Sequence, residues 1–211
     1  MQDMSLARRA MVVSQLLPQG VSNRAVVAAM ATVERERFVP DQLKDIAYMD
    51  RSLRVAPGRA MMPAAALGRI LTEVAPVAGE KALVVGSGTG YSSAVLIAMG
   101  LDVVSIESDK TLGAHANGAG IPTAETGDLT NGHAKAAPYD VILLDGAVEQ
   151  LPDVIVKQLA PNGRIGLAIS DRGVTRLAVG RPGGADLGIA TIVDADIPPL
   201  PGFEKPRQFT F

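Results

Sequence analysis

Three glycines at alternate positions, Gly86, Gly88 and Gly90, are the residues of this sequence with the clearest chemical meaning. They follow the apolar run Ala82–Val85 and precede the helix-like stretch Tyr91–Met99. Glycine lets the chain turn sharply and lets a ligand approach the backbone, and the unpaired amides at a helix N-terminus face that ligand. A strand, this loop and a helix in that order predict a cofactor-binding turn.

The residues after the loop favour one of two cofactors. The dinucleotide pattern G-x-G-x-x-G needs a glycine at position 91, where this chain has Tyr91. The G-x-G-x-G form with an acidic residue at the end of the next strand favours S-adenosylmethionine, and Glu107 is that residue in VVSIES. We favour a carboxylate that accepts hydrogen bonds from both ribose hydroxyls over a solvated residue at a strand end.

Two aspartates follow later strands and are further candidates. Asp128, in ETGDLTNG, is expected where the third strand ends, where it could meet the adenine amino group with Leu129 beside the ring. A plain turn residue is an equally good interpretation of Asp128. Asp145 follows the apolar run Val141–Leu144, where open α/β sheets bind ligands. Its role could be contact with the substrate, contact with the cofactor or capping of the next turn.

The elements that position these residues alternate along the chain. The runs Ala82–Val85, Val103–Ile106 and Val141–Leu144 are continuously apolar, which is typical of strands buried on both faces of a parallel sheet. Tyr91–Met99 and Thr111–Ala119 are the expected intervening helices. This order predicts an α/β fold that is Rossmann-like, with a mostly parallel central sheet and helices on both faces.

The two ends of the chain have other patterns, although no repeat or linker divides it, so a single domain over residues 1–211 is expected. Residues 1–78 are expected to form a helical N-terminal extension, and residues 79–211 the cofactor-binding α/β core. The expected N-terminal helices are Leu6–Leu17, one capped by Ser22 or Asn23, and Ala64–Val74 after Pro63. The expected antiparallel C-terminal strands are Ile165–Ile169, Arg176–Val179, Ile189–Val193 and an edge strand over Gln208–Phe211.

The composition excludes several classes of protein. The 211 residues are 47% hydrophobic, which suits a well-buried core, and the net charge of −2 gives no basic surface for nucleic acid. The pair Arg8-Arg9 is interpreted as a solvated helix face. Without cysteine there is no disulfide or thiolate metal site, and His115 and His133 are too far apart in sequence to suggest zinc. No apolar stretch reaches membrane-spanning length and no signal peptide is recognisable, so a cytoplasmic protein is expected.

These residues together resemble the protein-L-isoaspartate O-methyltransferase family over nearly the full chain. The matching pieces are RRAMVVSQLLPQGVSNRAVVAAMATVERERFVP, AYMDRSLRV, VVGSGTGYSSAVL with VVSIES, PYDVILLDGA and QLAPNGRI. The first piece is the most family-specific, because many methyltransferases share the glycine loop. The resemblance implies transfer of a methyl group from S-adenosylmethionine to the free carboxylate of an isoaspartyl residue in a damaged protein or peptide, which starts its repair. The expected cofactor contacts are Gly86, Ser87, Gly88, Gly90, Tyr91, Glu107, Ser108, Asp128, Leu129 and Asp145.

Two positions depart from the family pattern. The family places a Gln-Thr-Ile-Ser-like segment near the methyl-transfer centre, and here the aligned stretch has Ala60 and Met62 at the two hydroxyl positions, so no catalytic residue is assigned. The acidic residue that the family has two positions before Gly86 is Val84 in this chain. A buried acceptor carboxylate needs hydrogen-bond partners, so isoaspartyl peptides are expected to be poor substrates.

The same stretch supplies the candidates near the substrate, which are Arg59, Met61 and Met62. Arg59 could hold a carboxylate, although a surface arginine beside a loop glycine is the favoured interpretation. The methionines are interpreted as core filling or as contacts to the sulfur end of the cofactor.

Other function classes stay open beside the active enzyme. A divergent member could methylate a different acceptor, or a non-catalytic member could act as a binding module. A nicotinamide-dependent oxidoreductase is disfavoured by Tyr91, and a serine hydrolase because neither Ser92 nor Ser170 has a histidine partner in the sequence pattern.

Overall fold

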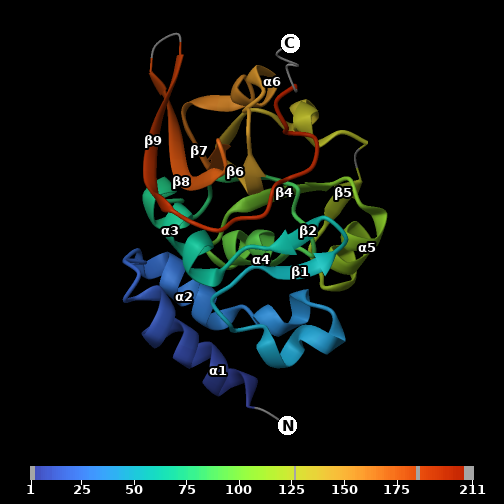
Figure 1. Ribbon diagram of the computed structural model, residues 1–211. Coiled ribbons are helices and arrows are strands. Elements are labelled where there is room, and N and C mark those ends of the chain that lie inside the picture. Colours follow the sequence, from blue (N-terminus) through green and yellow to red (C-terminus); the bar gives the residue numbers. More distant parts are fainter. Residues whose placement is uncertain (1–2, 126, 184–185, 207–211) are drawn as a thin grey trace.

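A single sheet of seven strands forms the centre of the computed structural model, which describes residues 3–125, 127–183 and 186–206. The strand order is β5-β4-β3-β6-β7-β8-β9. The strands are β3 (Lys81–Val85), β4 (Asp102–Glu107), β5 (Thr123–Glu125), β6 (Tyr139–Val148), β7 (Leu159–Asp171), β8 (Val174–Gly183) and β9 (Asp186–Asp194). The five neighbouring strands β5, β4, β3, β6 and β7 are parallel, and β8 and β9 add two antiparallel strands at the β7 edge (Figure 1). The predicted Rossmann-like fold with antiparallel C-terminal strands is confirmed.

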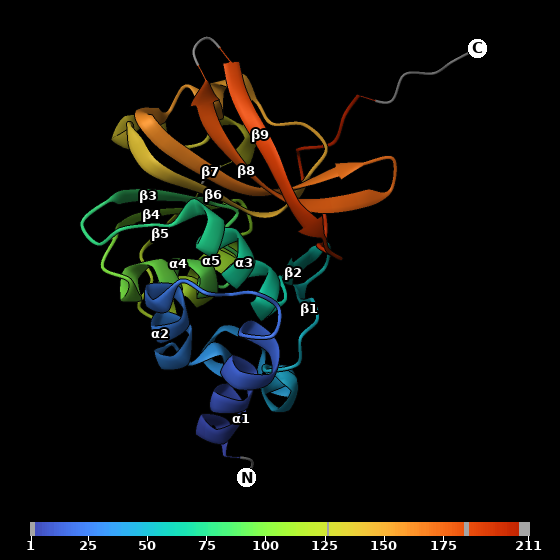
Figure 2. The same cartoon turned by 90° about the vertical axis from the view of Figure 1, so that its left-hand side faces the viewer.

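Both faces of the sheet are covered. The helices α3 (Ala64–Val74), α4 (Tyr91–Ala98) and α5 (Lys110–Gly118) lie together on one side of the sheet (Figure 2). On β3, Ala82 and Val84 pack into the core of that side, whereas Leu83 and Val85 pack into a second core that includes Ile155 of α6 (Asp153–Val156). A strand buried on both faces must be apolar at every position, which explains the unbroken run that predicted it.

The N-terminal region begins with two short helices. The helix α1 (Met4–Met11) continues as the π-helical turn η1 (Val12–Leu16), so the predicted helix over Leu6–Leu17 is present but changes its hydrogen-bond pattern at Met11. The helix α2 (Arg24–Thr32) is capped by Asn23, whose Oδ1 accepts from the amides of Ala25 and Val26 at 3.0 and 3.3 Å. Of the two caps proposed from the sequence, the structure uses asparagine.

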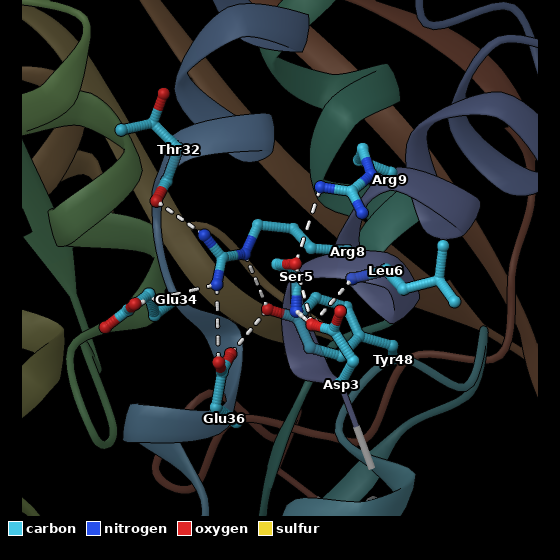
Figure 3. A network of polar contacts seen from close by, with 9 residues as sticks. All are labelled: Asp3, Ser5, Leu6, Arg8, Arg9, Thr32, Glu34, Glu36 and Tyr48. Atoms are coloured by element: carbon cyan, nitrogen blue, oxygen red, sulfur yellow. Dashed lines mark hydrogen bonds and ion pairs between the residues drawn. The ribbon is translucent and has the colours of Figure 1, made fainter.

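Arg8 ties α1 to the 3-10 turn η2 (Arg35–Phe38) and to Tyr48, which follows the 3-10 turn η3 (Asp41–Ile46). Its Nε donates to the hydroxyl of Tyr48 at 2.9 Å and its Nη2 to Glu36 at 3.3 Å, and the Tyr48 hydroxyl donates to Glu36 in turn (Figure 3). Its side chain is only 13% exposed. The interpretation of Arg8 as part of a solvated helix face is therefore wrong, because Glu36 and Tyr48 pack against its guanidinium.

A β-hairpin interrupts the region that was expected to be helical. The strands β1 (Leu53–Ala56) and β2 (Arg59–Met61) pair antiparallel through a turn at Pro57-Gly58, where Gly58 has φ +69°. Proline followed by a glycine of positive φ is typical of a type II turn. The helical expectation for residues 1–78 is therefore wrong at residues 53–61, and this hairpin carries Arg59 towards the sheet.

The chain returns to the sheet after β9. The amide of Ala147 donates to the carbonyl of Pro198 at 2.9 Å, and the amide of Leu200 donates to the carbonyl of Ala147 at 2.7 Å. Leu200 and Phe203 are each only 1% exposed. Figure 1 shows this red segment crossing the sheet in front of the strand ends. The edge strand predicted over Gln208–Phe211 lies outside the described residues.

Candidate functional site

The glycine turn has the geometry that the sequence predicts. Gly86, Gly88 and Gly90 have φ values of +71°, +56° and +97°, which side chains disfavour. The amide of Gly86 donates to the carbonyl of Ile106 at 3.0 Å, so the turn begins beside the end of β4. Gly90 directly precedes α4, and the Oγ1 atom of Thr89 donates to the carbonyl of Phe38 at 2.6 Å. The N-terminal region therefore holds this turn in place.

Glu107 stands next to the turn and is fully buried. It ends β4, and the parallel register that pairs Val85 with Ile106 sets its carboxylate beside the first glycine. Three backbone amides donate to this carboxylate, from Gly88 at 2.7 Å, Ser108 at 2.8 Å and Asp109 at 3.0 Å. Such a carboxylate is held in one orientation, as a ligand-binding acid must be.

Arg59 reaches the same carboxylate from the β1–β2 hairpin. Its Nη1 donates to Oε1 of Glu107 at 2.5 Å and its Nη2 donates to Oε2 at 2.8 Å. The Nη2 also donates to the carbonyl of Gly86 at 2.9 Å, and the residue is 8% exposed. The favoured interpretation as a surface arginine is wrong. The hairpin, which the sequence did not reveal, buries it in a two-pronged ion pair.

A small cavity lies between the hairpin and the turn. Its volume is about 10 Å³, roughly what one water molecule needs. The residues that line it are Val55, Arg59, Ala60, Met61, Gly86, Ser87, Gly88, Thr89, Tyr91 and Asp145. The structure thus brings Arg59 and Met61 of the predicted substrate-side residues to the same place as Asp145 and most of the predicted loop residues, whereas Met62 and Gly90 are not in this lining.

Several polar atoms around this cavity have no partner. The Oδ1 of Asp145 and the hydroxyl oxygens of Ser87 and Tyr91 are buried without a hydrogen bond to the described part of the chain. Burial raises the pKa of Asp145 to about 6. Buried polar atoms nearly always have partners, so such a cluster marks a place where a polar ligand can bind.

Asp128 and Leu129 lie apart from the cavity lining. The strand β5 ends at Glu125, and Asp128 caps the short turn η4 (Leu129–Asn131). Its carboxylate accepts from the amide and hydroxyl of Thr130 at 2.9 and 2.6 Å, and these bonds lower the pKa of Asp128. Asp128 is exposed, whereas Leu129 packs into the second core. The turn interpretation describes these contacts, and the adenine contact stays a prediction.

The two methionines of the hairpin differ in their surroundings. Met61 lines the cavity, whereas Met62 is 1% exposed in the first core and is absent from that lining. The carbonyl of Met62 accepts from the buried Arg35 at 2.7 Å. The core-filling interpretation therefore describes Met62, and only Met61 is placed to meet a ligand.

Two residues of the site were missed at the sequence level. Arg35 is fully buried, and its guanidinium lies over the ring of Tyr91 at 4.5 Å from the centroid. Its neighbours in VERERF are charged, which indicates a surface, so no signal marked it. Leu200 lies against Gly86, and the only sequence signal was the proline-rich stretch around it, which stiffens the chain without saying where it packs.

Comparison with known proteins gives the same family that the sequence motifs indicated. The model of the protein-L-isoaspartate(D-aspartate) O-methyltransferase (PCMT) family matches residues 7–181. The chain belongs to this family. Members of the PCMT family are S-adenosylmethionine-dependent methyltransferases whose known role is the repair of isoaspartyl damage in proteins. The predicted family and enzyme class are confirmed.

Curated PCMT relatives span most of the chain. The protein-L-isoaspartate O-methyltransferase of Methylorubrum extorquens (strain PA1) is 36% identical over 190 residues, covering 88% of this chain and 79% of that protein. The protein-L-isoaspartate O-methyltransferase 2 of Marinobacter nauticus is 32% identical over 211 residues, covering 96% of each. These lengths include the N-terminal region as well as the glycine turn.

Solved PCMT structures share the fold. One named protein-L-isoaspartate O-methyltransferase superposes with a TM-score of 0.79 at 22% identity, covering 92% of this chain and 66% of that chain. A PCMT from Plasmodium falciparum in complex with S-adenosyl-L-homocysteine superposes with a TM-score of 0.74 at 19% identity, covering 92% and 97%. Among the described residues, no helix is long and apolar enough to cross a membrane, and no cluster of three or more acidic or histidine side chains suits a metal.

Proposed function

We propose that this chain binds S-adenosylmethionine between the glycine turn and Glu107, and transfers its methyl group to a carboxylate of a protein or peptide substrate. The observation that carries the proposal is the Glu107 carboxylate, which is buried and held by three backbone amides beside the turn. Both of its oxygens accept from one planar group with two donors, the guanidinium of Arg59.

The donors and acceptors of the site fit the cofactor. A ribose diol offers two O–H donors side by side, and the Arg59 guanidinium stands in for that pair of donors on Glu107. The positive φ angles at positions 86 and 88 favour glycine, and glycine leaves the turn without side chains where the ligand approaches. Glu107 would hold the ribose, and the polar atoms of Ser87 and Asp145 that lack partners would face the bound molecule.

The residues of the chain contribute orientation more than proton chemistry. The cofactor supplies an electrophilic methyl group, and an acceptor carboxylate is already a nucleophile, so the rate depends on bringing the two into line. The hairpin residues Ala60 and Met61 would exclude water from that place. Asp145 lines the same cavity, and its pKa of about 6 leaves it mostly ionised at neutral pH, so it would act there as a hydrogen-bond acceptor.

Titration calorimetry with S-adenosylhomocysteine tests the proposal. The wild-type chain is expected to bind, and Glu107→Ala is expected to lose at least tenfold in affinity. The matched control is Glu80→Ala, because Glu80 also accepts two hydrogen bonds from one arginine, Arg164, at 2.7 and 2.9 Å, away from the cavity. The control should keep the wild-type affinity. Absence of binding to folded wild-type protein at high micromolar ligand would show that the proposal is wrong.

A divergent acceptor is the second candidate, and the apolar side chain of Ala60 favours it. This residue lines the cavity and offers no hydrogen bond to an acceptor carboxylate. Transfer of a labelled methyl group to an isoaspartyl peptide is expected to be slow in the wild type and faster in Ala60→Thr. Met62→Ser is the matched control, because Met62 lies in the core and not in the cavity lining. Rapid wild-type turnover would exclude this candidate.

The substrate class and the cellular location belong to the same proposal. A protein or peptide substrate is consistent with the family to which the chain belongs. The net charge of −2 gives no support for a nucleic-acid partner. We place the reaction in the cytoplasm, with which a chain without cysteine is compatible.

A further inference from the structure

The ion pair between Arg59 and Glu107 uses the acceptor capacity of the carboxylate completely. The Oε1 atom accepts from Arg59, Ser108 and Asp109, and the Oε2 atom accepts from Arg59 and Gly88. A carboxylate offers about four lone-pair sites, and six donors already share them here, because the Ser108 hydroxyl also donates to Oε1 at 3.4 Å. The two hydroxyls of a ribose could reach these oxygens only if the two guanidinium donors left.

The space around the pair gives the same result. Arg59 itself lines the cavity of about 10 Å³ between the hairpin and the glycine turn. A volume that holds about one water cannot hold a nucleoside. The Nη2 atom of Arg59 also donates a hydrogen bond to the carbonyl of Gly86, so the guanidinium lies across the turn at which the cofactor would bind.

The arginine can leave without disturbing the sheet. It is carried by a hairpin of two short strands, Leu53–Ala56 and Arg59–Met61, and it directly follows the turn glycine Gly58. A Cβ built on Gly58 would meet no atom within 4 Å, so this turn stands free of its surroundings. Motion of one flexible side chain and one open turn is sufficient to move the guanidinium.

A second acceptor is present for the displaced guanidinium. Asp145 lines the same cavity, and its Oδ1 is buried with no hydrogen-bond partner in the described chain. A buried guanidinium without an anion is strongly unfavourable, so it moves to a partner and not to an apolar wall. Asp145 is the only acidic residue among those that line this cavity.

We infer that Arg59 is a built-in competitor of the cofactor: it occupies the ribose position on Glu107 in the free protein and exchanges onto Asp145 when the cofactor binds. This inference rests on the proposed function. The apparent dissociation constant is then the intrinsic one divided by the fraction of molecules in which Glu107 is free. A pair that is closed in nine molecules out of ten weakens binding by about tenfold.

The test is calorimetric titration of S-adenosylhomocysteine into wild type, Arg59→Met and Arg164→Met, with a thermal melt of each free protein. Arg59→Met is expected to bind at least tenfold more tightly than wild type and to melt at a lower temperature. Arg164→Met removes the matched two-pronged pair with Glu80, so it should melt lower with unchanged affinity. A purely structural role for Arg59 would lower the melting temperature without tightening binding.

Asp145→Asn tests the second half of the exchange. It is expected to weaken binding several-fold in the wild-type background, where the guanidinium needs the carboxylate, and to have a clearly smaller effect in Arg59→Met. Equal effects in the two backgrounds would overturn the exchange onto Asp145. If Arg59→Met does not fold, Arg59→Lys replaces it, because a lysine cannot form the two parallel hydrogen bonds and should also bind more tightly than wild type.

The remaining outcomes separate this inference from the proposed function. If wild type binds and neither Arg59 variant binds more tightly, the inference is wrong and the proposed function stands. If folded wild type does not bind at high micromolar ligand, the proposed function is wrong, and the inference that rests on it is wrong as well.

Discussion

The side chain of Leu200 packs against Gly86 so closely that its Cδ1 atom lies 2.5 Å from the point that a Cβ at position 86 would take. Leu200 comes from the segment that returns to the sheet after β9, and the amide of that leucine is bonded to Ala147 of β6. The cofactor turn is therefore shaped from two sides, by the hairpin that carries Arg59 and by the end of the chain.

Substitution of the first turn glycine measures this contact. Gly86→Ala is expected to destabilise the protein by about 2–4 kcal/mol, because it combines a positive φ with a clash. Leu200→Ala should lower the cost of Gly86→Ala when the two are combined, by removing the clashing atoms. The control is Gly79→Ala, at φ +88° with no atom within 4 Å of the built Cβ, which should cost only about 1–2 kcal/mol. Additive costs in urea unfolding would contradict the contact.

The buried carboxyl of Asp145 predicts a pH dependence of stability. Its pKa is about 6 in the folded protein, above the value near 3.8 of the unfolded chain. Between these values the folded state binds more protons than the unfolded state, so this group lowers stability as pH rises from about 4 to 6. Asp145→Asn should be close to wild type near pH 4 and exceed it by about 3 kcal/mol at pH 7. Unfolding curves at both pH values check this, and parallel behaviour of the two proteins would refute it.

Neighbouring arginines on α1 provide a matched pair. Arg8 donates to Tyr48 and Glu36 and is 13% exposed, whereas Arg9 is exposed and makes one long bond of 3.4 Å to Ser5 (Figure 3). Arg8→Ala is expected to cost about 2 kcal/mol, because the buried acceptors lose a charged donor, and Arg9→Ala within about 0.5 kcal/mol. Denaturant midpoints measure both. Similar effects of the two substitutions would show that the network does not stabilise the fold.

Substitution of Arg35 is expected to cause the largest loss of stability in the N-terminal region. Its Nε and Nη2 donate to the carbonyls of Ala47 and Met62 at 2.9 and 2.7 Å, and the residue is fully buried. Arg35→Met fills a similar volume but leaves both carbonyls without donors, at a cost of about 2–4 kcal/mol. Arg37→Met, at an exposed position two residues on, should change stability by less than about 0.5 kcal/mol. Equal effects of the two substitutions would rule out this role for Arg35.

The parts of the fold that follow from local pattern were predictable. The runs Ala82–Val85, Val103–Ile106 and Val141–Leu144 all lie in parallel strands, because burial on both faces leaves a continuous apolar signature. Gly86, Gly88 and Gly90 needed positive φ angles, and only glycine accepts these readily. These elements define the turn and the position of Glu107 at the strand end.

The rest of the site depends on contacts between distant segments. The turn Pro57-Gly58 was the one local sign of the hairpin, and nothing near Arg59 indicates that its partner is Glu107. Arg35 and Leu200 are likewise buried by residues far away in the sequence. A charged residue is expected at the surface unless its partner is known, and the partner is known only from the fold.

The return of the chain to β6 has a consequence for synthesis of the protein on the ribosome. The segment that carries Leu200 hydrogen-bonds to Ala147 and covers Gly86, and it follows β8 and β9 in the sequence. The contact that covers the glycine turn can therefore form only after residue 200 has been synthesised. A nascent chain that stalls before Pro198 lacks the segment that covers Gly86.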